Sequence, residues 1–258
     1  MTRSKWRYIS ASVRGTSHIK SNTECQDNNL CETLNSTEGC ILLLLVSDGA
    51  GSAKRSADGS RLICETIRDE LRRYLSEDGR VSLINSRVVG HWIEAFRNEV
   101  ILLADGEGLS EREFACTLLG AVVGPSSAAF FQVGDGAIVF STENGGPYKL
   151  AFWPERGEYE NTTYFATQAT FIEQLQFLCL EVPTPEIAIL SDGLQRLALN
   201  YQTREAHTPF FGGLFPTVRS VPEVELAQMR EKLSAYLDSP KVNDRTDDDK
   251  TLVLAVSD

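Results

Sequence analysis

The 258-residue sequence lacks the features of several common protein classes. No apolar run approaches the length of about 20 residues that crosses a bilayer. The basic start, residues 1–7, lacks the apolar core of a secretion signal. Positive charge is scarce, since 25 Lys and Arg face 36 Asp and Glu, a net charge of −11. This deficit argues against nucleic acid or an anionic membrane as a partner. Because the start lacks the core of a secretion signal, we expect a cytoplasmic protein.

Several chemical motifs are also missing. None of the six cysteines forms a Cys-x-x-Cys pair, so free thiols are expected rather than a zinc site. The absence of a Gly-x4-Gly-Lys-Ser/Thr loop argues against a nucleotide-binding module. Neither a Cys-x5-Arg loop nor an Asp-x-Asp-x-Thr motif is present. No linker rich in Pro, Gly or Ser divides the chain, so residues 1–258 are expected to form one domain.

The most informative stretch that is present covers residues 40–52. Six apolar residues, Ile41 to Val46, run without a break and predict a strand buried on both faces. The run ends at Ser47, and Asp48 and Gly49 open a glycine-rich turn. A carboxylate at such a position is costly unless it is paired or bound to a cation.

The same arrangement recurs twice. The apolar residues 187–190 lead into Asp192, and Asp248 precedes the apolar run 251–256. Each Asp-Gly pair read alone is a common turn. Three aspartates that follow or precede buried strands instead predict a site at one sheet edge for hard divalent cations, which take oxygen ligands.

The remaining patterns predict an α+β protein. Helical spacing of apolar residues predicts helices over 54–76, 82–104 and 223–237, and a short one after Asp192. Residues 14–27 and 206–220 are expected to be loops, the second with Phe210, Phe211 and Phe215 pinning it to the core. Because strands and helices do not alternate regularly, layered sheets covered by helices fit better than a doubly wound parallel sheet. Strands are expected over 8–13, 41–46, 114–123, 128–133, 137–141, 174–182, 186–190 and 251–256.

Six short motifs in this order resemble those of the metal-dependent Ser/Thr protein phosphatases of type 2C, in a divergent bacterial-type branch. Each motif alone is weak evidence for this family, but six motifs in the family's order across nearly the whole chain are strong evidence. They are Gln26-Asp27 for the family's Glu-Asp, Asp48-Gly49-Ala50-Gly51-Ser52 for Asp-Gly-x-Gly-Gly, Ala115-Cys116-Thr117 for Gly-Ser/Cys-Thr, Gly134-Asp135-Gly136 for Gly-Asp-Ser, Ser191-Asp192-Gly193 for Ser-Asp-Gly and Asp248-Asp249-Lys250-Thr251 for Asp-Asn-x-Thr.

The resemblance implies an α-β-β-α sandwich of two mainly antiparallel sheets, with two Mn²⁺ or Mg²⁺ ions and a third, weaker one between the sheet edges. Phosphoserine and phosphothreonine in proteins would be hydrolysed by water activated between two cations, and a cognate kinase would make those substrates. The resemblance assigns Asp48 as a bridging ligand and Asp27 to orient the water. The other implied metal ligands are the Gly49 carbonyl, Asp192, Asp248, Asp135 and Gln26.

Three departures from the family pattern bear on activity. Gln26 replaces a glutamate and removes one negative charge, and Ala50 stands where some members have a histidine that acts as an acid. The family's phosphate-gripping arginine is also absent near Asn22, so we expect His18, with Arg14 and Lys20 as alternatives, to supply a proton or grip phosphate. The alternative is a catalytically weak module that binds phosphoproteins.

Overall fold

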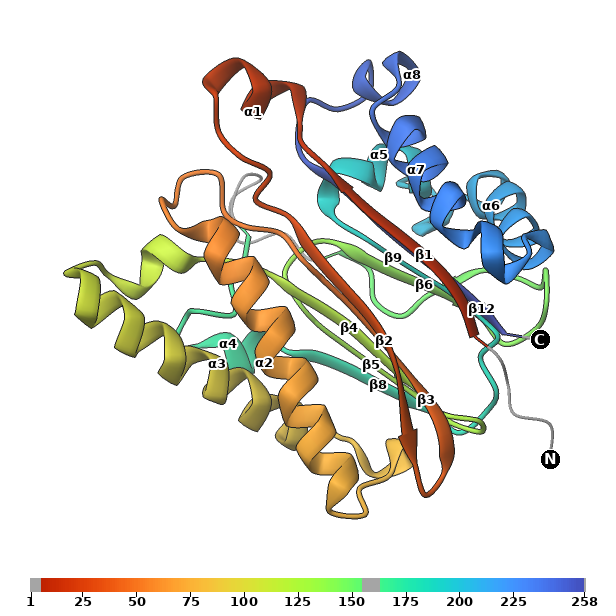
Figure 1. Cartoon of the computed structure of the whole chain (residues 1–258), viewed down its shortest axis with the longest axis horizontal. Coiled ribbons are helices and arrows are strands. Elements are labelled where there is room, and N and C mark those ends of the chain that lie inside the picture. The colour runs from red at the N-terminus through yellow and green to blue at the C-terminus, as the bar shows by residue number, and fades with distance from the viewer. Residues whose placement is uncertain (1–5, 155–162, 258) are drawn as a thin grey trace.

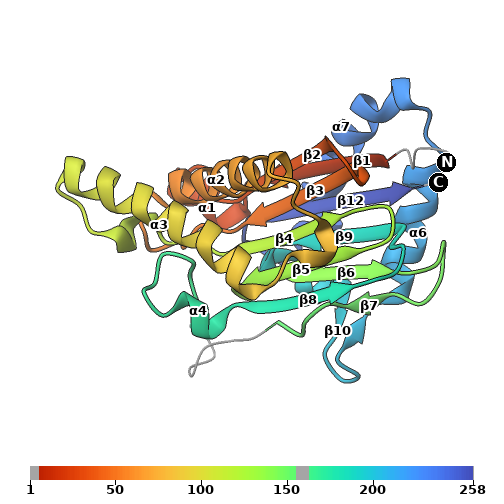
Figure 2. The same cartoon turned by 90° about the horizontal axis from the view of Figure 1, so that it is seen from below.

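The computed structural model describes residues 6–154 and 163–257, and in it two five-stranded sheets pack face to face with helices on both outer faces (Figures 1 and 2). Every pair of neighbouring strands in both sheets is antiparallel. This arrangement confirms the α-β-β-α sandwich expected from the sequence.

The first sheet contains both ends of the described chain and has the order β1 (Trp6–Val13), β12 (Lys250–Ser257), β9 (Glu186–Leu190), β6 (Ala137–Ser141), β7 (Lys149–Leu150). The second sheet has the order β2 (Asn28–Ser36), β3 (Gly39–Ser47), β4 (Leu118–Val123), β5 (Ala128–Val133), β8 (Gln176–Leu180). The short strands β10 (Leu199–Asn200) and β11 (Glu205–Ala206) form a separate hairpin.

Helices cover the two outer faces. The second sheet carries α2 (Ser56–Ser76) and α3 (Ser86–Glu107), and the first carries α6 (Thr208–Ser220) and α7 (Leu226–Leu237) (Figure 1). Four short helices lie in the connections: α1 (Thr16–Ser21), α4 (Phe171–Gln174), α5 (Gln195–Ala198) and α8 (Pro240–Asn243). Single 3₁₀ turns lie at Val81–Leu83, Glu111–Phe114, Asp192–Leu194 and Glu223–Glu225.

Strand β3 shows how the layers follow from the sequence. Its alternate residues Leu42, Leu44 and Val46 pack between the two sheets, whereas Ile41, Leu43 and Leu45 pack beneath α2 and α3. All six side chains are buried. Because both faces of the strand are covered, the sequence reads as a continuous apolar run instead of an alternating one. The predicted strand buried on both faces is confirmed.

The long helices begin and end largely where the sequence indicates. The side chain of Asn85 accepts hydrogen bonds from the backbone N–H groups of Arg87 and Val88 and so caps the start of α3. Gly108 ends that helix in the left-handed conformation, with φ of 67°. Gly90, in the middle of α3, is buried against α4, where an added Cβ would lie 2.9 Å from Cδ1 of Ile172.

Three sequence predictions of local structure were wrong. Residues 206–220, predicted as a loop, contain α6, in which Phe211, Phe215 and Val218 occupy one buried face. Burial of this face outweighs the poor helix propensity of the glycines and the proline within it. The aromatic side chains do pack against the core, as expected. Residues 14–27 contain α1, and the strand predicted from residue 114 begins at Leu118, after a 3₁₀ turn.

Part of the segment 142–164, whose path the sequence did not predict, lies outside the described residues. All six cysteines are free thiols. Within residues 6–154 and 163–257, no helix has both the length and the hydropathy needed to cross a bilayer.

Candidate metal centre

Four of the predicted acidic ligands line one cleft of about 920 Å³ at one end of the sandwich. Asp48 follows β3, Asp192 follows β9, Asp248 precedes β12, and Asp135 lies in the turn between β5 and β6. The expectation that a single sheet edge gathers them was wrong, because β3 belongs to the second sheet and β9 and β12 to the first. The carboxylates meet across the gap between the two sheets, as the family resemblance implied.

Asp48 and Asp192 are each followed by a glycine, and the missing side chain lets another segment of the backbone pack closely against the turn. A Cβ on Gly49 would lie 2.7 Å from the carbonyl oxygen of Gln26, and one on Gly193 would lie 2.0 Å from that of Asp249. Neither glycine has a positive φ, so the missing side chain rather than an unusual backbone angle explains the residue. These contacts bring the Asp48 turn against the segment before β2, and the Asp192 turn against the start of β12.

Burial and nearby charges raise the pKa of three carboxylates of the cleft. Burial, followed by the charges of neighbouring acids, raises the pKa of Asp48 well above its usual value. The same causes raise the pKa of Asp192 to about 7, and burial raises the pKa of Asp248. A protein environment that disfavours the charged form of several adjacent acids favours proton or cation binding there.

Asp27 and Gln26, predicted as site residues, are not among the residues that line the cleft. Both are buried, and Oδ2 of Asp27 accepts a hydrogen bond from the Ser191 hydroxyl over 2.7 Å. The same hydroxyl accepts the backbone N–H of Thr251, so Asp27 is fixed to the ends of β9 and β12. Burial raises the pKa of Asp27 to about 6.

The donor set fits hard divalent cations. Three buried oxygen atoms, Oδ1 of Asp27, Oδ1 of Asp192 and Oε1 of Gln26, accept no hydrogen bond from any N–H or hydroxyl group that the structure describes. Nearly every buried polar group in a folded protein has a partner, so such atoms call for a ligand. In the described part of the chain, no three Asp, Glu, His or Cys side chains are close enough to enclose an ion unaided. Water and phosphate oxygens complete such shells around Mg²⁺.

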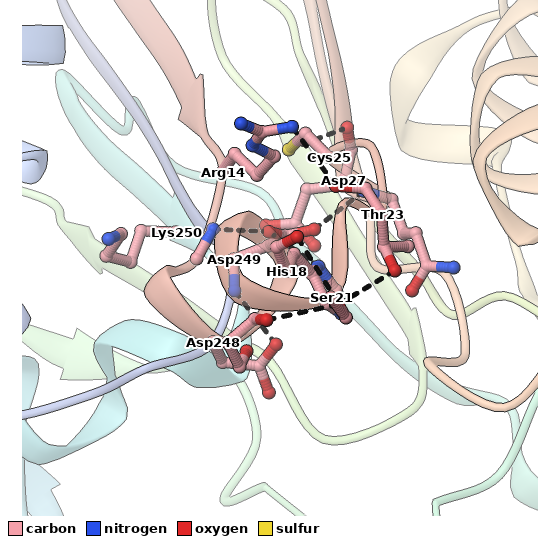
Figure 3. A network of polar contacts seen from close by, with 12 residues as sticks. Arg14, His18, Ser21, Thr23, Cys25, Asp27, Asp248, Asp249 and Lys250 are labelled. Carbon is pink, nitrogen blue, oxygen red and sulfur yellow. Dashed lines mark hydrogen bonds and ion pairs between the residues drawn. The ribbon is translucent and has the colours of Figure 1, made fainter.

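His18 reaches the cleft from α1, whereas its two alternatives do not. The cleft lining includes His18 but neither Arg14 nor Lys20. Arg14 instead donates to the carbonyl oxygen of Thr23 over 3.3 Å. Nδ1 of His18 lies 2.9 Å from Oδ1 of Asp249, a residue to which the sequence analysis gave no role (Figure 3).

The sequence analysis missed or misjudged three further residues. Thr117, expected to be an ordinary strand residue, lies before β4 and lines the cleft, where its Oγ1 accepts the backbone N–H of Asp48 over 2.9 Å. The hydroxyl of Thr163 donates to Oδ2 of Asp135 over 2.8 Å. Arg112 also lines the cleft. Thr117 belongs to one of the recognised motifs, but only the folded chain brings Thr163 and Arg112 to the site.

Comparisons with known proteins agree with this geometry. The family model described as protein phosphatase 2C matches residues 14–238. Serine/threonine-protein phosphatase 3 of Escherichia coli K12 is 34% identical over 257 residues, which cover 97% of this chain and 98% of that protein.

Two solved structures share the fold. The catalytic domain of the phosphatase PstP with two manganese ions superposes with a TM-score of 0.60 at 15% identity, covering 98% of each chain. PppA of Pseudomonas aeruginosa superposes with a TM-score of 0.57 at 19% identity, also covering 98% of each chain. The extent of the family match and the identity to the E. coli protein together establish that this chain belongs to the protein phosphatase 2C family, the metal-dependent serine/threonine protein phosphatases.

Proposed function

We propose that this cleft hydrolyses phosphoserine and phosphothreonine in proteins with two divalent cations, Mn²⁺ or Mg²⁺, and a third that is bound more weakly. The observation that carries this proposal is the set of four aspartates around one cleft, whose buried positions raise the pKa of Asp48 and Asp192. Cations there supply the charge that neutralises phosphoryl oxygens and lowers the pKa of a water nucleophile.

We carry over the ligand roles that the family resemblance implies. Asp48, with neighbouring acids on both sides of the cleft, would span two ions, and the Gly49 carbonyl would join one of them. Asp192 and Asp248 would complete the first ion's protein ligands, and Asp135 would hold the third. Oε1 of Gln26, buried behind the cleft, offers a neutral oxygen to the second ion.

The remaining residues act on the substrate and the water. Asp27, fixed by Ser191, would orient the attacking water and accept its hydrogen bond. His18, beside the Asp48 turn, would give a proton to the serine oxygen that leaves or bind the phosphate group. Arg112 lies where a cation can attract a phosphoryl group or an acidic neighbour of the phosphorylated residue.

The proposal extends to the substrate class and the cellular setting. A phosphoprotein made by a Ser/Thr kinase presents the phosphate on a flexible segment, and an open cleft at the end of the sandwich can receive it. We propose that residues 1–258 act as one catalytic domain in the cytoplasm, opposite such a kinase. Buried residues from both sheets share a core cluster, which supports one domain.

The alternative of a weak, phosphoprotein-binding module does not require all four acids. A phosphoserine peptide assay separates the two functions. Turnover is expected with Mn²⁺ or Mg²⁺, to disappear in excess EDTA and to return when the metal is added back. Full turnover in excess chelator would contradict the mechanism. Peptide binding without turnover of either the peptide or p-nitrophenyl phosphate would favour the module.

A further inference from the structure

Asp249 joins three segments that meet beside the cleft. Its carboxylate is 2% exposed and accepts the backbone N–H of Gly15 at Oδ1 and that of Gln26 at Oδ2, each over 2.6 Å. Nδ1 of His18 lies 2.9 Å from the same Oδ1 (Figure 3). The carboxylate therefore fixes the start of α1, the segment before β2 and one imidazole to the start of β12.

These contacts require a carboxylate at position 249. All three partners are nitrogen atoms, two of them backbone N–H groups that can only donate. An asparagine there would offer one oxygen, and its NH₂ group would face a donor. The family motif matched by Asp248-Asp249-Lys250-Thr251 has asparagine at this position, so Asp249 is a departure of this chain. It accompanies the other departure nearby, a histidine in α1 in place of the phosphate-gripping arginine.

The imidazole of His18 lies between Asp249 and the cleft. Its side chain is 15% exposed, and it lines the cleft together with Asp48. A Cβ on Gly51, in the turn after Asp48, would lie 4.0 Å from Nε2 of His18. One ring nitrogen thus lies against the buried acid and the other toward the turn that carries the proposed metal ligands.

We propose that Asp249 is the positioning residue for His18. The carboxylate holds one proton on Nδ1, so that the second proton of the cationic ring lies on Nε2, from which it is donated to the phosphate or given to the leaving oxygen of the substrate. The ring nitrogen and the oxygen are at contact distance, but the N–H is not yet aimed at the oxygen. Such contacts commonly tighten when substrate binds. A carboxylate partner that fixes the tautomer and orientation of an imidazole is a recurring device in enzyme sites.

The inference rests on the function proposed for His18, so its first test does not use activity. The protein has three histidines, and the other two are internal controls because Nδ1 of His91 lies 2.7 Å from the Arg87 carbonyl and that of His207 lies 3.1 Å from the Leu197 carbonyl. Long-range ¹H–¹⁵N spectra of the metal-free protein at about pH 8.5 report each tautomer, and His18→Gln assigns the His18 signal.

We expect His18 to be protonated at Nδ1 in the native protein and to shift toward Nε2–H in Asp249→Asn, while His91 and His207 keep their signals. A native His18 protonated at Nε2, or a tautomer that Asp249→Asn leaves unchanged, would overturn the proposal. The native spectrum decides the first point even if the Asp249→Asn variant fails to fold.

The second test is a double-mutant cycle on a phosphoserine peptide with Mn²⁺. Asp249→Asn should lower kcat about tenfold or more in the native background. In the His18→Ala background the same change should lower kcat by a factor at least about threefold smaller, because only the loss of the Gly15 and Gln26 contacts remains. Equal losses in both backgrounds would make Asp249 a loop anchor and overturn the proposal.

The outcomes also separate this inference from the proposed function. If EDTA abolishes turnover but His18→Ala leaves kcat unchanged, His18 has no catalytic role. The proposal that Asp249 positions His18 for the reaction is then overturned, while the metal-dependent function stands. Turnover that survives EDTA contradicts the metal-dependent mechanism instead, whatever the histidine spectra show.

Discussion

Strand β9 connects two regions that contain buried carboxylates. The carboxylate at one end is paired with an arginine, whereas Asp48 and Asp192 near the other end have no such pair among the residues that the structure describes. At its first residue, the fully buried Glu186 is paired with Arg219, whose Nη1 donates to Oε1 over 2.7 Å. The backbone N–H of Gly145 donates to the same oxygen over 3.1 Å. Just beyond the other end of β9, Asp192 lines the cleft with Asp48, Asp135 and Asp248. Burial, followed by the charges of Asp135 and Asp248, raises the pKa of Asp192 to about 7.

The two ends of β9 therefore differ in role: the buried ion pair contributes to stability, and the cleft acids contribute to the proposed function. At the paired end the protein supplies its own cation, and the same guanidinium also donates to Asn144 over 2.8 Å through Nη2. At the cleft end, neither Asp48 nor Asp192 forms an ion pair with a cationic side chain in residues 6–154 and 163–257, and burial raises the pKa of both. Such uncompensated charge is unfavourable for folding of the metal-free protein. The cleft is therefore the region in which charge compensation is left to a ligand.

The largest expected effect concerns the cleft. Asp48→Asn and Asp192→Asn should each lower kcat on phosphoserine peptides by about 10³-fold, because each removes a charged ligand of the proposed cations. The fold should survive, since repulsion between neighbouring carboxylates falls. Glu186→Gln makes the same chemical change at the paired end and should leave kcat within about twofold. Loss of activity in Glu186→Gln alone would break the comparison.

The paired end should show the reverse behaviour. Arg219→Ala leaves a buried carboxylate without its cation and should lower the free energy of unfolding by about 3 kcal/mol, without changing kcat. Urea denaturation in chelator measures this difference. Arg73→Ala is the control, because that guanidinium is 65% exposed in its pair with Glu70 and should contribute less than about 0.5 kcal/mol. Equal effects of the two changes would show that burial of the pair at Glu186 does not matter.

A smaller effect is expected on stability as a function of pH. Because Asp192 and Asp27 have folded pKa values of about 7 and about 6, they bind more protons folded than unfolded between about pH 4 and pH 7. Their contribution to stability is therefore present at the lower pH and is lost as the pH rises through 6 to 7.

In chelator, the unfolding temperature should rise by a few degrees as the pH falls from about 7.5 to about 5.5. Asp192→Asn should flatten this dependence because the titrating group is removed. A native protein whose unfolding temperature rises steadily with pH over that interval would show that the cleft acids are compensated within the protein.

Much of this architecture could be predicted from the sequence. The buried run Ile41–Val46 and the motifs around Asp48, Asp192 and Asp248 led to the correct sandwich and to residues that line one cleft. Helix α6 could not be predicted, because its glycines and proline oppose a helix and only burial of Phe211 explains it. A local sequence pattern can predict where a strand ends, but it cannot predict which other strand end lies opposite it in the folded protein.

Asp249 shows the same limit within the site. It stands beside Asp248 in the matched motif, yet its role depends on Gly15, His18 and Gln26, more than 220 residues earlier. A local sequence pattern cannot predict a contact between residues so far apart in the chain. The prediction that the acids meet at a single sheet edge was also wrong, because the local pattern is the same whether the strands belong to one sheet or to two sheets that face each other.

The most direct test of the central claim, that the cleft acids are compensated by a cation, is the number of protons released when Mn²⁺ binds. Calorimetry at about pH 6, in two buffers of different ionisation enthalpy, gives this number. Because the pKa of Asp192 is about 7 and that of Asp48 is also raised, we predict release of about one proton or more, and loss of Mn²⁺ binding in Asp48→Asn. Binding that releases no proton and is unchanged in Asp48→Asn would contradict this account.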